Sequence, residues 1–238
     1  MVEAGSVQAL MGNHEYNAIM FNMLGDEGCL RPHKIKNIKQ HMETLLQFHG
    51  KQDKYNEMIE WLKTLPMYIE TDGFRAMHAC WDSSSIERLA GLGSKGILSE
   101  EALRASADKT TELYDTVEVI CKGLEVPLPE GISFHDKDDT KRYDIRVKWW
   151  EDPKDKTYKD MSVVEGIKME PTPFDLEMDN YGAGEKPVFL GHYWLKGKPA
   201  ILKSNVCCLD YSVAKGGYLT AYRWYGEQVL SDSKLIWF

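Results

Sequence analysis

Histidine and asparagine side chains that could ligate a metal follow short apolar runs at three places in the sequence. The three polar clusters are Gly12-Asn13-His14-Glu15, His78 and Gly191-His192. In α/β sheets the loops at the carboxyl ends of strands line the ligand crevice, so clusters that each follow a strand can share one site. Imidazole nitrogens and an amide oxygen are suitable ligands for Mn, Fe, Zn or Ni. The pattern indicates a shared site whose side chains could hold one of these metals.

Each cluster also has a purely structural interpretation. Asn13 could be the N-cap of a helix that begins at His14, because Asn is among the best capping residues. His78 and His192, each taken singly, could be core histidines or could support a ligand without touching the metal. The remaining histidines lie in helical or polar-loop contexts and are interpreted as surface residues: His33, His41, His49 and His135. The tetrapeptide followed in order by the two later histidines favours the functional interpretation.

Short strands and one helix are expected to position these clusters. Residues 6–11 (SVQALM) predict a short buried strand that ends at a turn, and a helix is expected from 14 to 24. The turn signal Thr71-Asp72-Gly73 predicts a hairpin between strands at 67–70 and 74–77. Further strands are expected at 187–190, 206–209 and 218–224. Alternating strands and helices of this kind predict a mixed α/β fold.

The helical and polar segments lie mainly between these strands. An apolar face of Tyr55, Met58, Ile59 and Leu62 predicts one amphipathic helix, and a long helix is expected from 99 to 122. Residues 83–170 also contain a charged stretch around 135–139 and the pair Trp149-Trp150. We interpret 83–170 as an inserted cap-like region within one domain that spans 1–238. The two tryptophans could stack on a nucleobase or belong to the core.

Composition excludes several classes of protein. The chain has 238 residues, 43% hydrophobic and 28% charged, which is a globular balance and excludes a disordered chain. Its net charge of −8 offers no general basic face, so nucleic-acid binding is not indicated. Its 5 cysteines form no Cys-x-x-Cys, which argues against a disulfide framework and for a reducing cytoplasm. Neither a signal peptide nor a membrane span is expected, and we expect a cytoplasmic protein.

The order of the clusters resembles that of the calcineurin-like metallophosphoesterases, most closely the phosphoprotein phosphatase and bacterial diadenosine-tetraphosphatase branch. The tetrapeptide at 12–15 matches the family's GNHE block, which is highly specific. His78 matches a single-histidine block of moderate specificity, and Gly191-His192 matches a later GH block. Leu209-Asp210 and the following residues 216–220 resemble the closing strand pair. The resemblance covers both ends of the chain but not 83–170.

The resemblance implies a sandwich of two mixed β-sheets flanked by helices, with the inserted cap. It implies that Asn13, His78 and His192 ligate one of two divalent metals (Mn, Fe, Zn or Ni), and that His14 is the general acid. The two metals would hold the phosphoryl oxygens and activate water for hydrolysis of a phosphate ester or anhydride. The substrate would be a phosphorylated small molecule, a dinucleotide or a phosphoprotein, and the sequence does not choose between them.

The sequence departs from the family upstream of the tetrapeptide. It contains no Asp-x-His, and its one Gly-Asp, at Gly25-Asp26, lies downstream and has Cys29 where the second Asp belongs. The ligands of the first metal, the bridging carboxylate, the Asp that orients the general acid and the phosphate-binding Arg are therefore absent. We expect the chain to be the carboxyl-terminal portion of a longer enzyme, with impaired activity. The alternative is an inactive truncated or decayed fragment that keeps the fold as a binding module.

Overall fold

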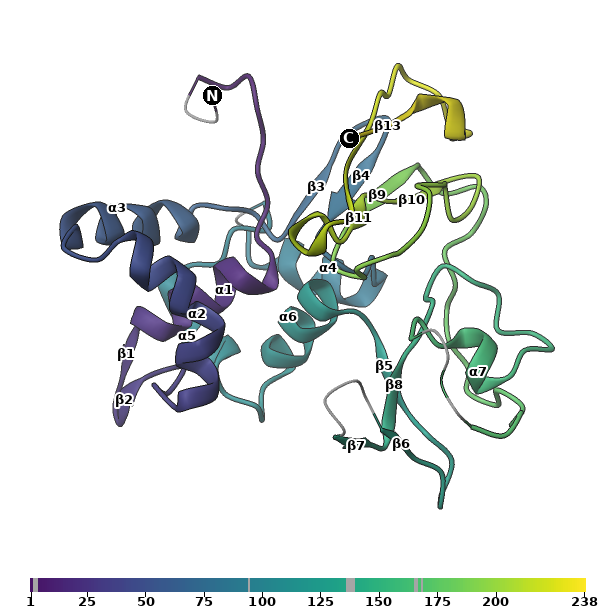
Figure 1. Cartoon of the computed structure of the whole chain (residues 1–238), viewed down its shortest axis with the longest axis horizontal. Coiled ribbons are helices and arrows are strands. Elements are labelled where there is room, and N and C mark those ends of the chain that lie inside the picture. Colours follow the sequence, from purple (N-terminus) through teal and green to yellow (C-terminus); the bar gives the residue numbers. More distant parts are fainter. Residues whose placement is uncertain (2–3, 94, 136–139, 165–166, 168) are drawn as a thin grey trace. The chain divides into compact units, whose positions relative to one another are not determined.

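The computed structural model describes residues 1, 4–93, 95–135, 140–164, 167 and 169–238, and the chain has a mixed α/β fold (Figure 1). It divides into two compact units. The first unit comprises Met1–Ile69 and Asp82–Cys121, and the second comprises Glu70–Trp81 and Lys122–Phe238. The α/β class agrees with the sequence prediction. Most of the charged stretch expected at 135–139 lies outside the described residues, which include only His135 of it.

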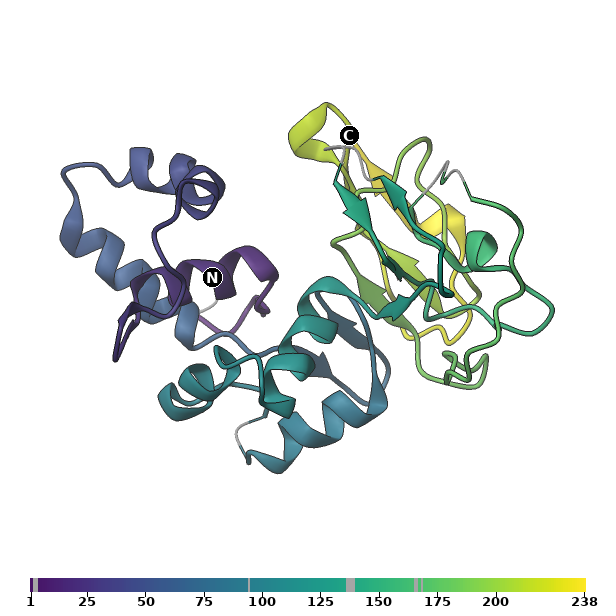
Figure 2. The same cartoon turned by 90° about the horizontal axis from the view of Figure 1, so that it is seen from below.

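Helices make up most of the first unit (Figure 2). They are α1 (Asn13–Asn22), α2 (Ile35–Gln47), α3 (Gln52–Lys63), α4 (Ser83–Gly91), α5 (Glu100–Ser106) and α6 (Glu112–Lys122). A small hairpin of β1 (Leu24–Gly25) and β2 (Gly28–Cys29) follows α1. The helices predicted after residue 13 and around residue 59 are confirmed. No helix within the described residues combines the length and the apolar character needed to cross a membrane.

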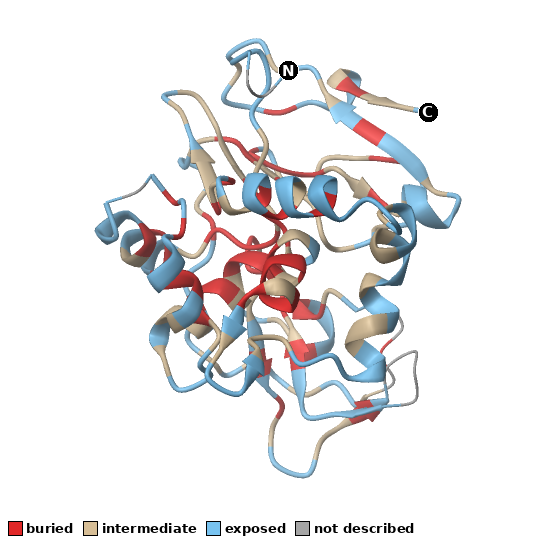
Figure 3. Ribbon diagram, turned by 90° about the vertical axis from the view of Figure 1, so that its left-hand side faces the viewer, coloured by how far each residue is buried: buried red, intermediate tan, exposed pale blue. Residues whose placement is uncertain are grey.

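Helix α1 contains the last three residues of the GNHE tetrapeptide, and part of the helix is buried. Its buried residues include Tyr16, Ile19 and Phe21. Figure 3 colours the described residues by burial, with the buried ones in red. The helix starts after Gly12, whose backbone N–H donates to Glu15 Oε2 at 3.0 Å. Gly12 therefore occupies the N-cap position. The interpretation of Asn13 as the N-cap is wrong, because Asn13 is already the first helical residue.

Two predicted elements differ from the structure in this unit. Residues 6–11 form no strand: the apolar run is exposed at its start, and its last residue, Met11, donates one backbone hydrogen bond to Pro66 O at 2.8 Å. A strand requires a partner that pairs along its length, and no described strand pairs with this run. The helix predicted from 99 to 122 is interrupted, because Asp108 Oδ1 accepts the Thr110 N–H at 2.9 Å and this local turn replaces the helical bond.

The second unit contains a four-stranded sheet with the order β10-β9-β4-β3. Its strands are β3 (Tyr68–Glu70), which carries the chain from the first unit into the second, β4 (Arg75–Met77), β9 (Val188–Leu190) and β10 (Val206–Cys208). Strand β9 pairs in parallel with β4 on one side and with β10 on the other. A second, antiparallel sheet joins β11 (Asp210–Tyr211), β12 (Tyr218–Tyr222) and β13 (Leu235–Trp237). The strands predicted along this part of the chain are confirmed.

The expected cap, residues 83–170, is shared between the units, with 83–121 in the first and 122–170 in the second. The later part contains the pairs β5 (Glu125–Pro127) with β8 (Asp144–Arg146) and β6 (Phe134–His135) with β7 (Lys141–Arg142), followed by α7 (Tyr158–Met161). Whether 83–170 acts as a cap stays a prediction. Trp149 and Trp150 are each only 3% exposed, so they belong to the core and do not offer a stacking surface.

Native-state thiol labelling is expected to separate Cys29 from the other cysteines. None of the five forms a disulfide, Cys29 is partly exposed, and the others are buried. Burial raises the pKa of Cys207 and of Cys208 to about 12, so their reactive thiolate is scarce near neutral pH. We expect a short maleimide pulse at pH 8 to modify Cys29, and the others only after unfolding, as read by peptide mass spectrometry. Rapid labelling of Cys207 or Cys208 in the native chain would contradict their burial.

Candidate functional site

His78 and His192 face each other in the second unit. Strand β4 ends at Met77 directly before His78, and strand β9 ends at Leu190, two residues before His192. Because β4 and β9 are parallel neighbours, their carboxyl ends lie at the same edge of the sheet. His78 Nε2 and His192 Nδ1 form a hydrogen bond of 3.2 Å, and the ring centroids are 5.1 Å apart. The structure brings these two residues together as their positions after the two strands predict.

The spacing of the two nitrogens fits a single metal ion. Two imidazole nitrogens that each lie about 2.1 Å from one ion are about 3.0 to 3.4 Å apart at octahedral or tetrahedral angles. The observed 3.2 Å falls within this interval. Among the described residues, no three or more His, Cys, Asp or Glu side chains form a group that could hold a metal. The pair can therefore supply two nitrogen ligands for one ion, and within the described residues no third His, Cys, Asp or Glu joins it to form a metal-binding group.

The loop that carries His192 has an unusual backbone. His192 and Trp194 have positive φ angles of 70° and 53°, in the left-handed region that non-glycine residues rarely adopt. Such conformations cost about 1–3 kcal/mol each and persist where the surroundings hold them. Asp210 supplies part of this support, because its Oδ2 accepts the Trp194 N–H at 3.2 Å and its backbone oxygen accepts the Leu195 N–H at 3.0 Å. The strained loop places His192 at the end of β9.

A set of buried hydrogen bonds connects this loop to the loop that carries His78. The Tyr193 hydroxyl donates to Ala79 O at 3.1 Å, and Trp149 Nε1 donates both to the Tyr193 hydroxyl and to Ala79 O, each at 3.1 Å. Burial raises the pKa of Tyr193 well above its ordinary value, so the hydroxyl stays protonated and keeps donating. Gly123 packs closely here, since a Cβ at that position would lie 2.7 Å from the Tyr193 hydroxyl oxygen.

Removing the Tyr193 hydroxyl is expected to lower the free energy of unfolding by about 1 kcal/mol, the usual net contribution of a buried hydrogen bond. Tyr193→Phe keeps the ring, and Trp149 retains Ala79 O as an acceptor. Tyr143→Phe is the matched control, because Tyr143 is 59% exposed. Urea unfolding curves of the two variants provide the comparison. If Tyr193→Phe and Tyr143→Phe unfold at the same urea concentration, the Tyr193 hydroxyl does not stabilise the fold.

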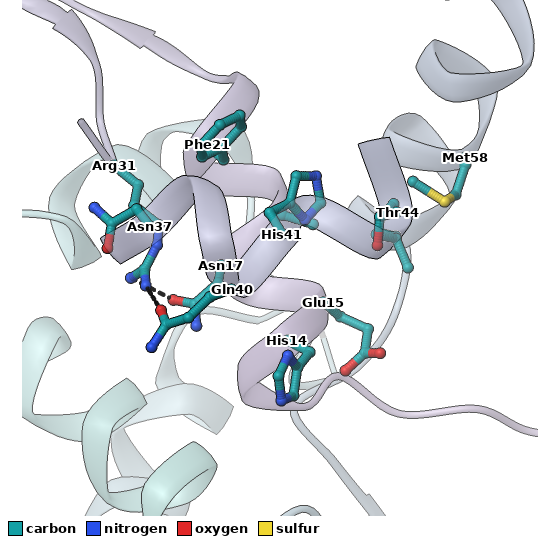
Figure 4. A pocket seen from close by; sticks show the side chains of 12 residues that line it. His14, Glu15, Asn17, Phe21, Arg31, Asn37, Gln40, His41, Thr44 and Met58 are labelled. Carbon is teal, nitrogen blue, oxygen red and sulfur yellow. Dashed lines mark hydrogen bonds between the residues drawn. The ribbon is translucent and has the colours of Figure 1, made fainter. Parts of the chain in front are cut away.

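The remaining predicted site residues, Asn13 and His14, lie at the start of α1 in the first unit. Asn13 is partly exposed and His14 is exposed. His14 lines a cavity of about 150 Å³, to which α1, α2 and α3 contribute residues (Figure 4). That Asn13 and His14 act together with His78 and His192 stays a prediction.

The cavity also contains side chains that the sequence did not single out as functional. Arg31 and His41 line it. His41 Nε2 is 2.7 Å from the Tyr55 hydroxyl, and the side chain is partly buried, so its interpretation as a surface residue is wrong. Burial lowers the pKa of His41, and electrostatic interactions with Arg31, His14 and His33 lower it further. His33, His49 and His135 are exposed, as predicted.

The sequence did not identify the residues that support the His78–His192 pair or Arg31 in the cavity. The supporting residues are Tyr193, Trp149 and Asp210. Asp210 belongs to a block that carries the family resemblance, and Tyr193 directly follows another such block, but no local pattern predicted their hydrogen bonds. Arg31 follows the small hairpin, and its cavity forms only when three helices fold together.

Comparison of the sequence with models of known protein families and with curated proteins found no match.

Proposed function

We propose that this chain is a metal-dependent phosphoesterase related to the calcineurin-like enzymes. The observation that carries the proposal is the pair of imidazole nitrogens 3.2 Å apart at the ends of two neighbouring parallel strands. The GNHE tetrapeptide at the start of a mostly buried helix supports it. In this proposal the four-stranded and three-stranded sheets are the two sheets of a metallophosphoesterase-type sandwich, and residues 83–170 form its cap.

The proposed metal ligands are His78 and His192, and the family resemblance adds Asn13 to them. The resemblance assigns these residues to one divalent ion, either Mn, Fe, Zn or Ni. When bound, such an ion polarises a phosphoryl oxygen as a Lewis acid. The residues of the chain would fix the ion's position: β4 and β9 place the two imidazoles, and the Asp210-supported loop holds His192 in its left-handed conformation.

His14 is proposed as the general acid. Imidazole is the side chain most often used for proton transfer in catalysis, and His14 is exposed at the first turn of α1, where substrate can reach it. Its proton would pass to the leaving oxygen as the bond between that oxygen and phosphorus breaks. The proposal thus gives the histidines different roles: His78 and His192 bind the metal, and His14 transfers a proton.

The proposed substrate is a phosphorylated small molecule, a dinucleotide or a phosphoprotein, hydrolysed in the cytoplasm. We expect turnover to be slow. Hard divalent ions favour carboxylate oxygens, and the proposed ligands, two imidazoles and a carboxamide, are all neutral. A weakly held ion would be lost easily, so activity should depend strongly on added metal.

The test uses the purified full chain, stripped of metal with EDTA and assayed on p-nitrophenyl phosphate. We expect no hydrolysis without metal and slow hydrolysis once Mn is added, with Zn, Fe, Ni and Mg tested in parallel. Metal analysis of the same samples reports binding separately from turnover. Metal binding without hydrolysis would favour the inactive binding module, and hydrolysis that ignores the metal would contradict the proposed site.

A further inference from the structure

The geometry points to a second binding site in the first unit: we propose that the cavity lined by α1, α2 and α3 binds a single phosphate-type oxyanion through Arg31. The site stands apart from the proposed metal ligands, because none of Asn13, His78 and His192 lines this cavity. The inference is independent of whether the chain hydrolyses phosphate esters.

Two neutral acceptors hold the Arg31 guanidinium in place. Its Nη1 donates to Asn17 Oδ1 at 2.9 Å, and its Nη2 donates to Gln40 Oε1 at 2.5 Å. The backbone is fixed as well, because the Arg31 N–H donates to Met20 O at 2.9 Å. Figure 4 shows the two amide oxygens and the guanidinium together at one side of the cavity.

The charge of Arg31 is not matched by a carboxylate at close range. In the described part of the chain, Arg31 makes no ion pair, whereas other arginines of the same unit do: Arg104 pairs with Glu100 and Arg88 with Glu112. Partly burying an unpaired charge is unfavourable. Burial accordingly lowers the pKa of Arg31, against the opposing effects of Glu118 and Tyr16, but a guanidinium remains charged in a protein. An oxyanion in the cavity would supply the missing negative charge.

A guanidinium has five N–H donors, and the bonds to Asn17 and Gln40 use one on each of two nitrogens. The other donors are available for oxygens of a ligand, and planar arginine donors match phosphate geometry. The Asn37 amide also lines the cavity; it donates one N–H to Pro32 O at 2.8 Å, and its second N–H can donate to a ligand.

Among the described residues of the lining, Glu15 is the acidic one, and its carboxylate lies away from the guanidinium. Glu15 accepts the Gly12 N–H at the start of α1, and Figure 4 shows its carboxylate apart from Arg31. The cavity measures about 150 Å³, below the roughly 300–1,000 Å³ of pockets that take drug-sized ligands. The size suits one phosphate group and excludes a whole nucleotide from the cavity.

Binding of inorganic phosphate to the full, EDTA-treated chain tests this site by isothermal titration calorimetry. We expect saturable binding that weakens by about tenfold or more in Arg31→Gln, because the charge-assisted bonds are lost. Arg104→Gln is the matched control and should bind like the wild type. Acetate should bind more weakly than phosphate, because it presents fewer anionic oxygens.

Two further variants make the result decisive. His192→Ala should keep phosphate binding, which separates this site from the proposed metal centre and from the fate of the proposed function. Gln40→Ala removes a support of Arg31 without removing the charge and should weaken binding less than Arg31→Gln, so it replaces that variant if the latter does not fold. The inference is overturned if the wild type shows no saturable binding, or if a folded Arg31→Gln binds phosphate with unchanged affinity.

Discussion

Replacing His192 with Ala is expected to remove the metal ion and to abolish metal-dependent hydrolysis of p-nitrophenyl phosphate. His192 supplies one of two facing nitrogens 3.2 Å apart. Because the proposed site has few ligands, removal of one should greatly weaken metal binding. Loss of a preorganised charge-stabilising group commonly costs about 10²–10³ in rate, and loss of the ion itself should cost at least as much. Metal content by elemental analysis and initial rates with added Mn are the two measurements. His78→Ala should behave in the same way.

The control for these variants is His49→Ala, because His49 is an exposed histidine of the first unit. It should retain both metal and activity. The double variant His78→Ala with His192→Ala adds a sharper test, since residues that act as a unit are strongly non-additive. If the two imidazoles hold one ion, the double variant should be no worse than either single one. Losses that multiply would mean that His78 and His192 contribute separately, and the shared ion would have to be abandoned.

Much of the strand pattern could be predicted from the sequence because each strand is a short apolar run closed by a turn. The hairpin at Thr71-Asp72-Gly73 and the runs that became β9 and β10 are examples. The same rule failed at residues 6–11, where an equally apolar run has no described strand beside it. Periodicity alone does not tell whether a partner strand exists, and local side-chain bonds such as that of Asp108 interrupt a helix without changing its apolar period.

The candidate site could be predicted only where a possible metal ligand closely follows a strand in the sequence. His78 and His192 satisfied that condition, and the parallel pairing of β4 with β9 brought them together. The residues that hydrogen-bond around the two histidines do not meet this condition. Tyr193 bonds to Ala79 across 114 positions of sequence, and Trp149 reaches the same carbonyl from 70 positions away. Hydrogen bonds over such separations are consequences of the tertiary fold and leave no local signature.

Replacing His14 with Ala is expected to slow hydrolysis in a way that depends on the leaving group. A general acid contributes about 10²–10⁴-fold when the leaving oxygen needs a proton, and little when that oxygen is already a stable anion. Alkyl phosphates should therefore lose most of their turnover in His14→Ala. p-Nitrophenyl phosphate should lose far less. The measurement is kcat for both substrates with Mn present, in the wild type and in the variant.

The contrast between substrates distinguishes proton donation from a structural role of His14. Exposure at the first turn of α1 makes a large folding defect unexpected, and urea unfolding of His14→Ala checks this directly. Metal content should stay at the wild-type level, because His14 is not one of the proposed ligands. His49→Ala serves as the matched control, since His49 is also an exposed histidine of the first unit but does not line the cavity that His14 lines. Equal losses on the alkyl and aryl esters would show that His14 does not protonate the leaving group, and the proposed division of roles among the histidines would then be wrong.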